Sequence, residues 1–539
     1  MHLVVFALVL LSRLPLCAQD NPYPPGTFQL APKVDLGLQP VELEIPAQFG
    51  DLPPITLNLP PGFSASVFAV TSRPGRARMM AFSPRGVLHL AHATRILALP
   101  DRDADGVADE VIEVASGLTW TNSIAFYKGD LYAAETDKII RYRDADGDLV
   151  YEEQEIFIDT LPWAESAWHT SRAIAFDEIN EKVYVAIGSP CDLCRSEKPF
   201  RAASLERLEP NPEWDAVLEF NTDGTGRRVF ATGMRNVVGM DIHPITNELW
   251  GDHNGHDQEG AHLPPEWIDV IGDGDFQGYP FVYGYQVPMD FSIERYTDKD
   301  LLPLTRQDSL RIQTHQAPVA LVEAHQAPLG IHFYRGDLFP PQYQNMAFVS
   351  LHGGMVEGNL SVVPGFKVIA VFSAPDGSNA KVADFLTGFG RGPERADVWG
   401  KPVGITTDAA GNMFVSSDSN NMVVLKITHS AVSGLWEHRL PEEIPVGSEL
   451  SAAALVRLLR LAEGGGPSRV TANLETFGGP RALELGAEGD NAFRLDAALE
   501  VRGALGPRTI SVLIEQDVGD VTHRMSLSRT IEVVSPLAG

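Results

Sequence analysis

The chain has 539 residues, 44% of them hydrophobic, and a formal net charge of −29 at pH 7. This length exceeds what one small core can organise, so we expect two or more domains. The acidic balance, with no clustered run of Lys or Arg, argues against nucleic-acid binding, which needs a basic surface. The 48 glycines and 39 prolines indicate many turns and favour β structure over helix bundles.

The N-terminal segment predicts export. Residues 3–11 form an apolar run that is too short to cross a bilayer comfortably, and small residues follow as far as Cys17 and Ala18. This pattern is typical of a secretory signal peptide at 1–18, so we expect a secreted or periplasmic protein. A lipid anchor on Cys17 is the alternative, although Leu16 is larger than that chemistry usually accepts. We find no other segment apolar and long enough to be transmembrane.

A repeated unit follows a proline-rich, extended leader at 19–60. Each unit has an apolar strand, a turn with Asp, Asn or Gly, and a second strand with a bulky apolar residue. Units that cannot bury their faces alone stack on their neighbours, so the repeats predict a six-bladed β-propeller at 61–428, with a β-sandwich carrying long loops as the alternative. The six copies lie at 79–99, 123–144, 173–189, 239–255, 330–354 and 404–427.

The repeat pattern stops near residue 428, and 429–445 are expected to be a linker. Alternating strands then fill 446–539, where length and strand number suit a small immunoglobulin-like β-sandwich. We see no clustered catalytic residues there, so attachment, packing or partner contact is its expected role. The predicted fold class is all-β, a six-bladed β-propeller followed by a small immunoglobulin-like β-sandwich.

The cysteines indicate a local disulfide. The chain has three, and Cys17 is expected to leave with the signal peptide. Cys191 and Cys194 remain, in PCDLC, which excludes a four-cysteine zinc site. A c-type haem needs His directly after the second Cys, where this chain has Arg195. In an exported chain, a Cys191–Cys194 disulfide is the leading interpretation.

One acidic loop has the spacing of a calcium site. Its carboxylates stand at loop positions one, three, five and nine, with a turn glycine at six, and oxygen ligands at this spacing can wrap a Ca²⁺. The bidentate Glu at position twelve is missing, and a solvated acidic turn is the alternative. The four carboxylates belong to Asp101, Asp103, Asp105 and Asp109.

Polar residues precede several of the repeat strands. His169 stands in a loop before the third copy, and Arg235 and Asn236 stand before the fourth, which could supply a general base and a fixed cation. Loops from different blades converge on one mouth of a propeller, where several cationic or imidazole groups would suit an anionic cofactor. The further basic residues near such loops are Arg78, Arg172, His352 and Lys401.

Several segments in order resemble one known family. They are HTSRAIAF, VYVAIGSPCDLC, GMRNVVGMDIHP, ELWGDHNG, LPPE, HQAPLGIHFYRG and GKPVG. Together, over about residues 60–428, they are similar to the soluble quinoprotein dehydrogenases, the sorbosone and aldose dehydrogenase group that uses pyrroloquinoline quinone (PQQ). The resemblance implies a six-bladed propeller with PQQ and Ca²⁺ near its axis.

The same resemblance implies roles for individual residues. His169 would be the general base, Arg235 would stabilise the developing oxyanion of the cofactor, and Asn236 would help to hold it. Backbone carbonyls of Gly255 and His256 would ligate the calcium that polarises PQQ. The remaining cofactor contacts would come from Arg78, Arg172, His352 and Lys401.

The motifs also depart from the family pattern. HGGMVEG stands where relatives often have HGSWNR, GKPVG where they have GRPVD, and GAHLPPE where they have GDDLPPE. These differences fit either another substrate or a propeller that has lost its cofactor.

The predicted function is oxidation of a sugar, a sorbosone-like aldehyde or a related alcohol by hydride transfer to PQQ. Because the haem motif is absent, electrons would leave to a separate acceptor. Two alternatives are a non-catalytic propeller that binds glycans or a protein partner, and a calcium-dependent lactonase-like hydrolase.

Overall fold

The computed structural model describes residues 21–72, 75–165, 167–195, 200–201, 207–208, 210–297, 301–354, 364–390, 397–462, 464–489, 491–519 and 521–536. The expected signal peptide at 1–18 lies outside these residues. Strands dominate the described chain, which confirms the all-β class. None of the helices in the described residues is long and apolar enough to span a membrane. These helices are α1 (Arg306–Thr314), η1 (Ala47–Phe49), η2 (Glu294–Tyr296), η3 (Pro341–Tyr343) and η4 (Glu475–Phe477).

Six antiparallel sheets of four strands form the larger part of the described chain. Sheets one and two consist of β4 (Met80–Phe82), β5 (Leu88–Ala91), β6 (Ala93–Leu99) and β7 (Ile112–Thr121), then β8 (Ser123–Tyr127), β9 (Asp130–Ala134), β10 (Ile139–Arg143) and β11 (Glu153–Ile158). Sheets three and four consist of β12 (Ile174–Asp177), β13 (Lys182–Ile187), β16 (Ala216–Asn221) and β17 (Arg228–Thr232), then β18 (Val237–Ile242), β19 (Leu249–His253), β20 (Glu266–Val270) and β23 (Ala320–Val322). Sheets five and six consist of β24 (Pro328–Phe333), β25 (Ala347–Leu351), β26 (Lys367–Phe372) and β27 (Lys381–Leu386), then β28 (Pro402–Thr407), β29 (Met413–Ser417), β30 (Val423–His429) and β3 (Phe63–Val70).

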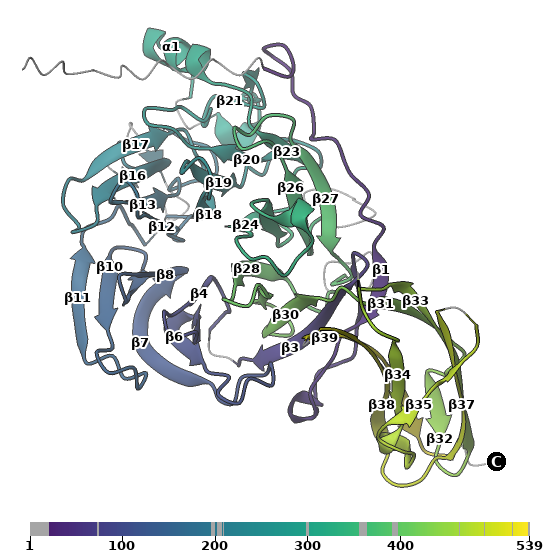
Figure 1. The fold of residues 1–539 in the computed structure, drawn as a ribbon. Coiled ribbons are helices and arrows are strands. Elements are labelled where there is room, and N and C mark those ends of the chain that lie inside the picture. The colour runs from purple at the N-terminus through teal and green to yellow at the C-terminus, as the bar shows by residue number, and fades with distance from the viewer. Residues whose placement is uncertain are drawn as a thin grey trace, which may run out of the picture.

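The first strands of the six sheets contact one another in the order β4, β8, β12, β18, β24, β28 and back to β4. The sheets therefore form a closed ring, called the ring below, over residues 63–429 (Figure 1). Strand β3 completes sheet six by pairing with β30, with Phe63 opposite His429. One sheet thus joins both ends of the ring, and each of the six sequence repeats falls within one sheet. Long connections in sheets three and four carry the short strands β14 (Phe200–Arg201), β15 (Arg207–Leu208), β21 (Val282–Tyr283) and β22 (Val287–Pro288).

Glycines allow the innermost strands to approach one another closely. A Cβ atom on Gly330 of β24 would lie 2.2 Å from the carbonyl oxygen of Val403 in β28. A Cβ atom on Gly404 of β28 would lie 2.6 Å from the carbonyl oxygen of Arg78. In both cases the added Cβ would clash with a backbone oxygen, which cannot rotate away as a side chain could. These two positions therefore require glycine where neighbouring strands meet near the ring axis.

The leader runs along the outer strands of the ring before entering it. Lys33 forms a parallel bridge to Val382 in sheet five. Strands β1 (Gln39–Glu42) and β2 (Thr56–Leu59) then pair as an antiparallel hairpin. Leu57 of this hairpin is fully buried in a core cluster shared with sheets five and six. The extended leader expected from the sequence thus contributes apolar side chains to the ring.

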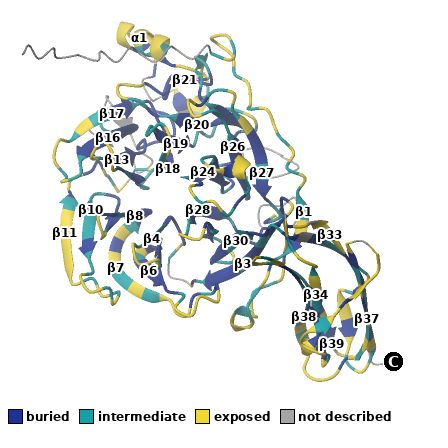
Figure 2. Cartoon of the chain, viewed as in Figure 1, coloured by how far each residue is buried: buried dark blue, intermediate teal, exposed yellow. Residues whose placement is uncertain are grey.

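A second unit of two sheets follows the ring, with a core drawn from residues 432–533 (Figure 2). The segment expected to be a linker, 429–445, contains its strands β31 (Ser433–His438) and β32 (Glu443–Pro445). Arg529 of this unit pairs with Glu42 of the leader hairpin at 3.1 Å. One sheet consists of β31 (Ser433–His438), β33 (Glu449–Arg460), β37 (Ala492–Glu500) and β36 (Gly486–Ala487). The other consists of β32 (Glu443–Pro445), β39 (Val521–Val534), β38 (Gly506–Val518), β34 (Arg469–Asn473) and β35 (Leu483–Glu484).

Candidate active site

His169 is held in one tautomer at the edge of sheet three. It lies in the loop before β12, and its Nδ1–H donates to the carbonyl oxygen of Ser189 at 2.5 Å. A carbonyl can only accept, so the proton sits on Nδ1 and Nε2 carries a lone pair. Gly188 permits this placement, because a Cβ atom there would lie 2.5 Å from the Cβ of His169. Burial, and then the nearby guanidinium of Arg235, lower the pKa of His169 to about 3, so the imidazole is neutral at pH 7.

Ser189 also connects His169 to Arg235. The backbone N–H of Ser189 donates to the carbonyl oxygen of Arg235 at 2.6 Å, while its own carbonyl accepts from His169. Ser189 follows β13 and Arg235 precedes β18, so the contact bridges sheets three and four. The structure thus brings together the imidazole and the guanidinium that the sequence placed in loops of two different repeats.

Two carboxylates surround the Arg235 guanidinium, which is almost completely buried. Its Nη2 lies 2.7 Å from Asp192 Oδ1 and 3.1 Å from Asp257 Oδ2, and its Nε donates to the Asp192 carbonyl at 3.0 Å. The contact from Nη1 to the carbonyl oxygen of Asn254 is longer, at 3.4 Å. Burial by itself would lower the pKa of Arg235, but Asp257 and Asp192 raise it above its ordinary value. The guanidinium therefore stays charged, with Nη1 as its most weakly held nitrogen.

A second buried network closes the ring between sheets one and six. Arg78 donates through Nε to Asn122 Oδ1 at 2.9 Å and through Nη1 to Asp418 Oδ2 at 3.1 Å. The other carboxylate oxygen of Asp418 accepts from Nε2 of His352 at 2.9 Å. Lys401 lies beside this network: its carbonyl accepts from the Asp418 N–H at 3.2 Å, and its Nζ sits 5.3 Å from the centre of the Phe366 ring.

Arg172 joins the two networks. It is fully buried, and its guanidinium donates to backbone carbonyls, including that of His169 at 3.1 Å and that of Pro162 at 2.7 Å. Its own carbonyl accepts from Asn122 Nδ2 at 3.4 Å. Burial lowers the pKa of Arg172 to about 9. Its Nε has no partner among the described residues.

An apolar layer lies directly behind these polar residues. Met79, Val238, Leu329 and Val403 form one buried cluster, and each belongs to, or immediately precedes, the first strand of its sheet. Met79 follows Arg78 in the chain, and Val238 lies two residues after Asn236. The polar residues therefore lie at one end of the inner strands, and the apolar cluster follows directly along those strands.

The last residue of β19 and the loop after it lie against Arg235. His253 accepts from the backbone N–H of Arg235 at 2.8 Å, and Asn254 donates through its N–H to the Asn236 carbonyl at 2.9 Å. Glu266 accepts from the N–H of Gly255 at 2.6 Å. Burial raises the pKa of Glu266 to about 8. The expected calcium ligands, the carbonyls of Gly255 and His256, thus belong to a loop that adjoins Arg235.

Comparisons with known proteins agree with this arrangement. The family model described as TrAA12-like matches residues 57–262 and 276–428. The chain belongs to the TrAA12-like family. This membership confirms the family resemblance seen in the sequence motifs.

Individual relatives of this TrAA12-like protein are distant. An uncharacterized protein of Borreliella burgdorferi is 26% identical over 380 residues, which cover 68% of this chain and 90% of that protein. The holo form of the pyranose dehydrogenase PQQ domain from Coprinopsis cinerea has a TM-score of 0.55 at 18% identity and covers 72% of this chain and 100% of that chain. A calcium structure of the Trichoderma reesei AA12 enzyme also has a TM-score of 0.55, at 16% identity, over 69% of this chain and 96% of that chain. At these identities the two solved structures support the fold.

The acidic loop of this TrAA12-like protein lies between β6 and β7, away from the residues above. Carboxylate oxygens of Asp101, Asp103 and Asp105 lie within 4.8 Å of one another. Asp109 is not part of this close group, and its Oδ2 accepts from the backbone N–H of Arg102 in the same loop at 2.6 Å. A similar group, Asp144, Asp146, Asp148 and Glu152, occupies the corresponding loop of sheet two.

The cysteines form the expected disulfide, with an S–S distance of 2.04 Å. Sequence reasoning missed Asp192, which stands between Cys191 and Cys194 and binds Arg235. It also missed Asn122 and Asp418. A buried arginine requires an acceptor, but only Asp192, in PCDLC, stands in a motif already singled out; which acceptor meets which arginine depends on how the sheets meet around the ring.

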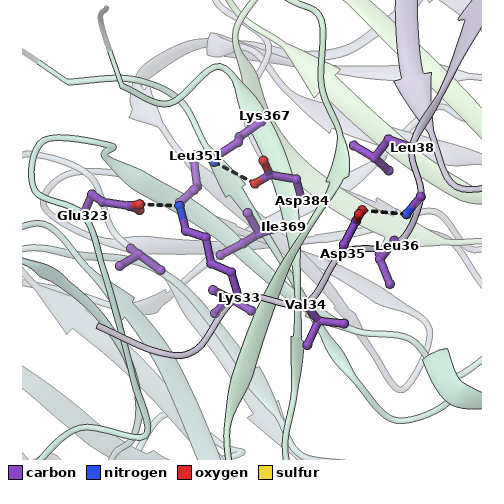
Figure 3. Close-up of a pocket in the computed structure, with 13 residues that line it drawn as sticks. Lys33, Val34, Asp35, Leu36, Leu38, Glu323, Leu351, Lys367, Ile369 and Asp384 are labelled. Carbon is purple, nitrogen blue, oxygen red and sulfur yellow. Dashed lines mark hydrogen bonds and ion pairs between the residues drawn. The ribbon is translucent and has the colours of Figure 1, made fainter. Parts of the chain in front are cut away.

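A separate pocket of about 330 Å³ lies under the leader, against sheets four and five (Figure 3). Four of its charged side chains form two pairs, Lys33 with Glu323 at 2.5 Å and Lys367 with Asp384 at 2.7 Å, and Asp35 accepts from the backbone N–H of Gly37. None of the residues of the His169 and Arg235 networks lines it. We therefore place the candidate active site at the polar end of the inner strands.

Proposed function

We propose that this TrAA12-like protein is an exported, PQQ- and Ca²⁺-dependent oxidoreductase that oxidises a sugar, a sorbosone-like aldehyde or a related alcohol. The observation that carries the proposal is the fixed, neutral His169 beside the charged Arg235. The likeness to the PQQ domain of the Coprinopsis pyranose dehydrogenase and to the calcium structure of the Trichoderma AA12 enzyme supports it. In this proposal the ring is a six-bladed β-propeller at 61–428, and the C-terminal unit is an immunoglobulin-like sandwich without catalytic residues.

The residues present fit an anionic, planar cofactor. Asn236 Oδ1 and Arg172 Nε are buried polar atoms without partners among the described residues, and both belong to the segments around His169 and Arg235. A bound polar group could satisfy them, which is a common reason for such atoms in native proteins. The further basic contacts in this proposal come from Arg78, His352 and Lys401.

The proposed base step belongs to His169. Because Nδ1–H is committed to Ser189, Nε2 is the atom that accepts the proton of a substrate hydroxyl. Arg172 donates to the His169 carbonyl and so fixes the loop from behind. PQQ, when bound, would take up the hydride from the substrate carbon.

Arg235 provides a fixed positive charge beside the base. Its Nε and Nη2 are occupied by Asp192 and Asp257, so Nη1 is the nitrogen we expect to donate to developing negative charge. A donor already oriented by buried partners loses little freedom when it binds, which is what such stabilisation requires. The backbone carbonyls of Gly255 and His256 would hold Ca²⁺ next to this charge, with Glu266 orienting the loop.

Two tryptophans support a sugar substrate. Trp163 and Trp168 are 46% and 36% exposed and stand in the same loop as His169. Backbone hydrogen bonds hold the loop near each tryptophan. The carbonyl of Pro162, next to Trp163, accepts from Arg172, and the Trp168 N–H donates to the Pro190 carbonyl at 3.1 Å. Broad aromatic faces next to a polar site suit the apolar face of a pyranose ring.

Reconstitution tests the proposal. Purified apoprotein is titrated with PQQ in the presence of Ca²⁺, and reduction of an artificial dye is followed with a panel of aldoses and alcohols. We expect saturable quinone binding and substrate-dependent dye reduction, with electrons leaving to this separate acceptor. His169→Ala is the control, because it should bind PQQ without turnover. Absence of quinone binding by the folded wild-type protein would refute the proposal.

A second candidate, a non-catalytic sugar-binding ring, is favoured by one observation. The cations expected to meet the cofactor are already paired internally, Arg78 with Asp418 and Arg235 with Asp192. Such a ring would bind the same sugars without PQQ. Calorimetric sugar binding by apoprotein that never binds quinone would support it.

A further inference from the structure

A four-residue loop closed by the Cys191–Cys194 disulfide lies against Arg235. Both cysteines are buried, and their Cα atoms are 6.1 Å apart. Tyr279 holds the loop from one side: its hydroxyl accepts from the Cys194 N–H at 3.0 Å and lies 2.8 Å from Ser189 Oγ. Ser189, which contacts both His169 and Arg235, is thus linked through Tyr279 to the disulfide loop.

Asp192, inside this loop, binds Arg235 through both its main chain and its side chain. Its carbonyl accepts from Nε at 3.0 Å and its Oδ1 accepts from Nη2 at 2.7 Å. The same Oδ1 accepts from the Asp257 N–H at 3.1 Å, and Oδ2 accepts from the Tyr296 hydroxyl at 2.8 Å. With both oxygens engaged, the carboxylate has one orientation.

The two carboxylates of Arg235 differ in how firmly they are held. The Asp192 side chain is 5% exposed and sits in the cross-linked loop, whereas the Asp257 side chain is 23% exposed. A buried, charge-assisted contact fixes geometry more strongly than a partly solvated one. Asp192 is therefore the partner that determines where the guanidinium points.

We propose that Asp192, fixed by the Cys191–Cys194 disulfide, is the positioning residue that aims Arg235 beside His169. The inference rests on the proposed function for its catalytic consequence, but the positioning itself can be measured without a cofactor. Asp192 touches no reacting atom; it acts through Arg235.

The first experiment uses apoprotein and the arginine reagent phenylglyoxal, with modification of Arg235 followed by mass spectrometry. Loss of the carboxylate should free the guanidinium, so Asp192→Ala should raise the modification rate of Arg235 about tenfold. Asp192→Asn should give a smaller rise in this modification rate. Because Asn is nearly isosteric with Asp, this variant also controls for misfolding. The double variant Cys191→Ser, Cys194→Ser should resemble Asp192→Ala, since the loop is no longer closed.

The matched control is Asp241→Asn, which removes the carboxylate from another arginine pair, with Arg335 at 2.7 Å, at the end of β18 remote from Arg235. It should lower Tm without changing the reactivity of Arg235. The reconstituted enzyme supplies the second readout: Asp192→Asn should lower kcat about tenfold or more with little change in KM, because Arg235 acts after the substrate is bound.

The proposal is overturned if Asp192→Asn and Asp192→Ala lower Tm but leave both the reactivity of Arg235 and kcat at wild-type values. If wild-type protein binds no PQQ, the proposed function fails, yet the phenylglyoxal experiment still decides the positioning role.

Discussion

Arg78 and Asp418 are 340 residues apart in the chain, yet they form a buried ion pair of 3.1 Å. Arg78 precedes sheet one and Asp418 follows β29 of sheet six, so the pair joins these two neighbouring sheets. His352, from sheet five, donates to the same carboxylate at 2.9 Å. The contacts that hold sheets one, five and six together and the candidate active site therefore share one carboxylate.

Replacing Asp418 by Asn should destabilise the ring. The substitution leaves Arg78 buried without its counter-charge, and breaking a buried pair in this way costs about 3 kcal/mol or more. Denaturant unfolding of the variant and of wild type measures the difference. Asp384→Asn, in the half-exposed pair with Lys367, is the control and should cost about 1 kcal/mol or less.

The same carboxylate predicts an acid-dependent loss of stability. Burial would raise the pKa of Asp418, but its hydrogen bond from His352 and the charge of Arg78 lower it well below its usual range. A folded-state pKa below the unfolded value contributes stability above about pH 4, and that stability is lost as the pH falls further. Wild type should therefore lose more free energy of unfolding between about pH 5 and pH 2 than Asp418→Asn. Parallel curves would contradict this.

His169→Ala should lower kcat by about two to four orders of magnitude while PQQ titration and Tm stay close to wild type. Because the pKa of His169 is lowered to about 3, the free enzyme keeps its base unprotonated at mildly acidic pH. The acid limb of kcat/KM against pH due to this group should accordingly lie below about pH 5 and not near 6.5. An acid limb near 6.5 that disappears in His169→Ala would show that the imidazole is not buried as described.

The repeats and the residues before them could be predicted from the sequence, because period-two alternation and turn residues are local signals. The same local signals pointed to His169, Arg235 and Arg78, because each of them stands in the loop before the first strand of a repeat. The acceptors that these arginines contact could not be predicted. The contact of Asp418 with Arg78, and that of Asp192 with Arg235, depend on which strands meet around the ring, and no local pattern encodes this. The grouping of Asp101, Asp103 and Asp105 follows from their alternate spacing in one turn, whereas the place of Asp109 depends on how the loop returns to Arg102.

Gly330→Ala should be among the most destabilising single substitutions in the ring. The added methyl group would lie 2.2 Å from the Val403 carbonyl oxygen, and a backbone atom can move away only by separating β24 from β28. Overpacking of this kind costs about 1–3 kcal/mol or more. Thermal unfolding compares it with Gly486→Ala, where nothing lies within 4 Å and the change should be nearly neutral. Equal melting temperatures would argue against the close approach of the two strands.

The acidic loop of sheet one should bind one structural Ca²⁺. The double variant Asp103→Asn, Asp105→Asn removes two of the three clustered carboxylates and should lower the calcium content by about one ion per chain, measured by equilibrium dialysis. Chelation should lower the Tm of wild type more than that of the variant, because only wild type loses a bound ion from this loop. Dye-linked activity at saturating Ca²⁺ should stay unchanged. Unaltered calcium content would identify the loop as a solvated acidic turn.

Trp168→Ala and Trp163→Ala should raise KM for a pyranose substrate while changing kcat little. Loss of an aromatic contact worth about 1 kcal/mol corresponds to roughly a fivefold weaker enzyme–substrate complex. Because the sugar would stack on the same aromatic faces in the ground state and in the transition state, kcat should change little. Ile179→Ala, which removes a 77% exposed apolar side chain from sheet three, is the control and should leave KM unchanged. A fall in kcat with constant KM in the tryptophan variants would instead mean that the loop acts through His169, and the two tryptophans would then be supports of the base and not a surface for the sugar.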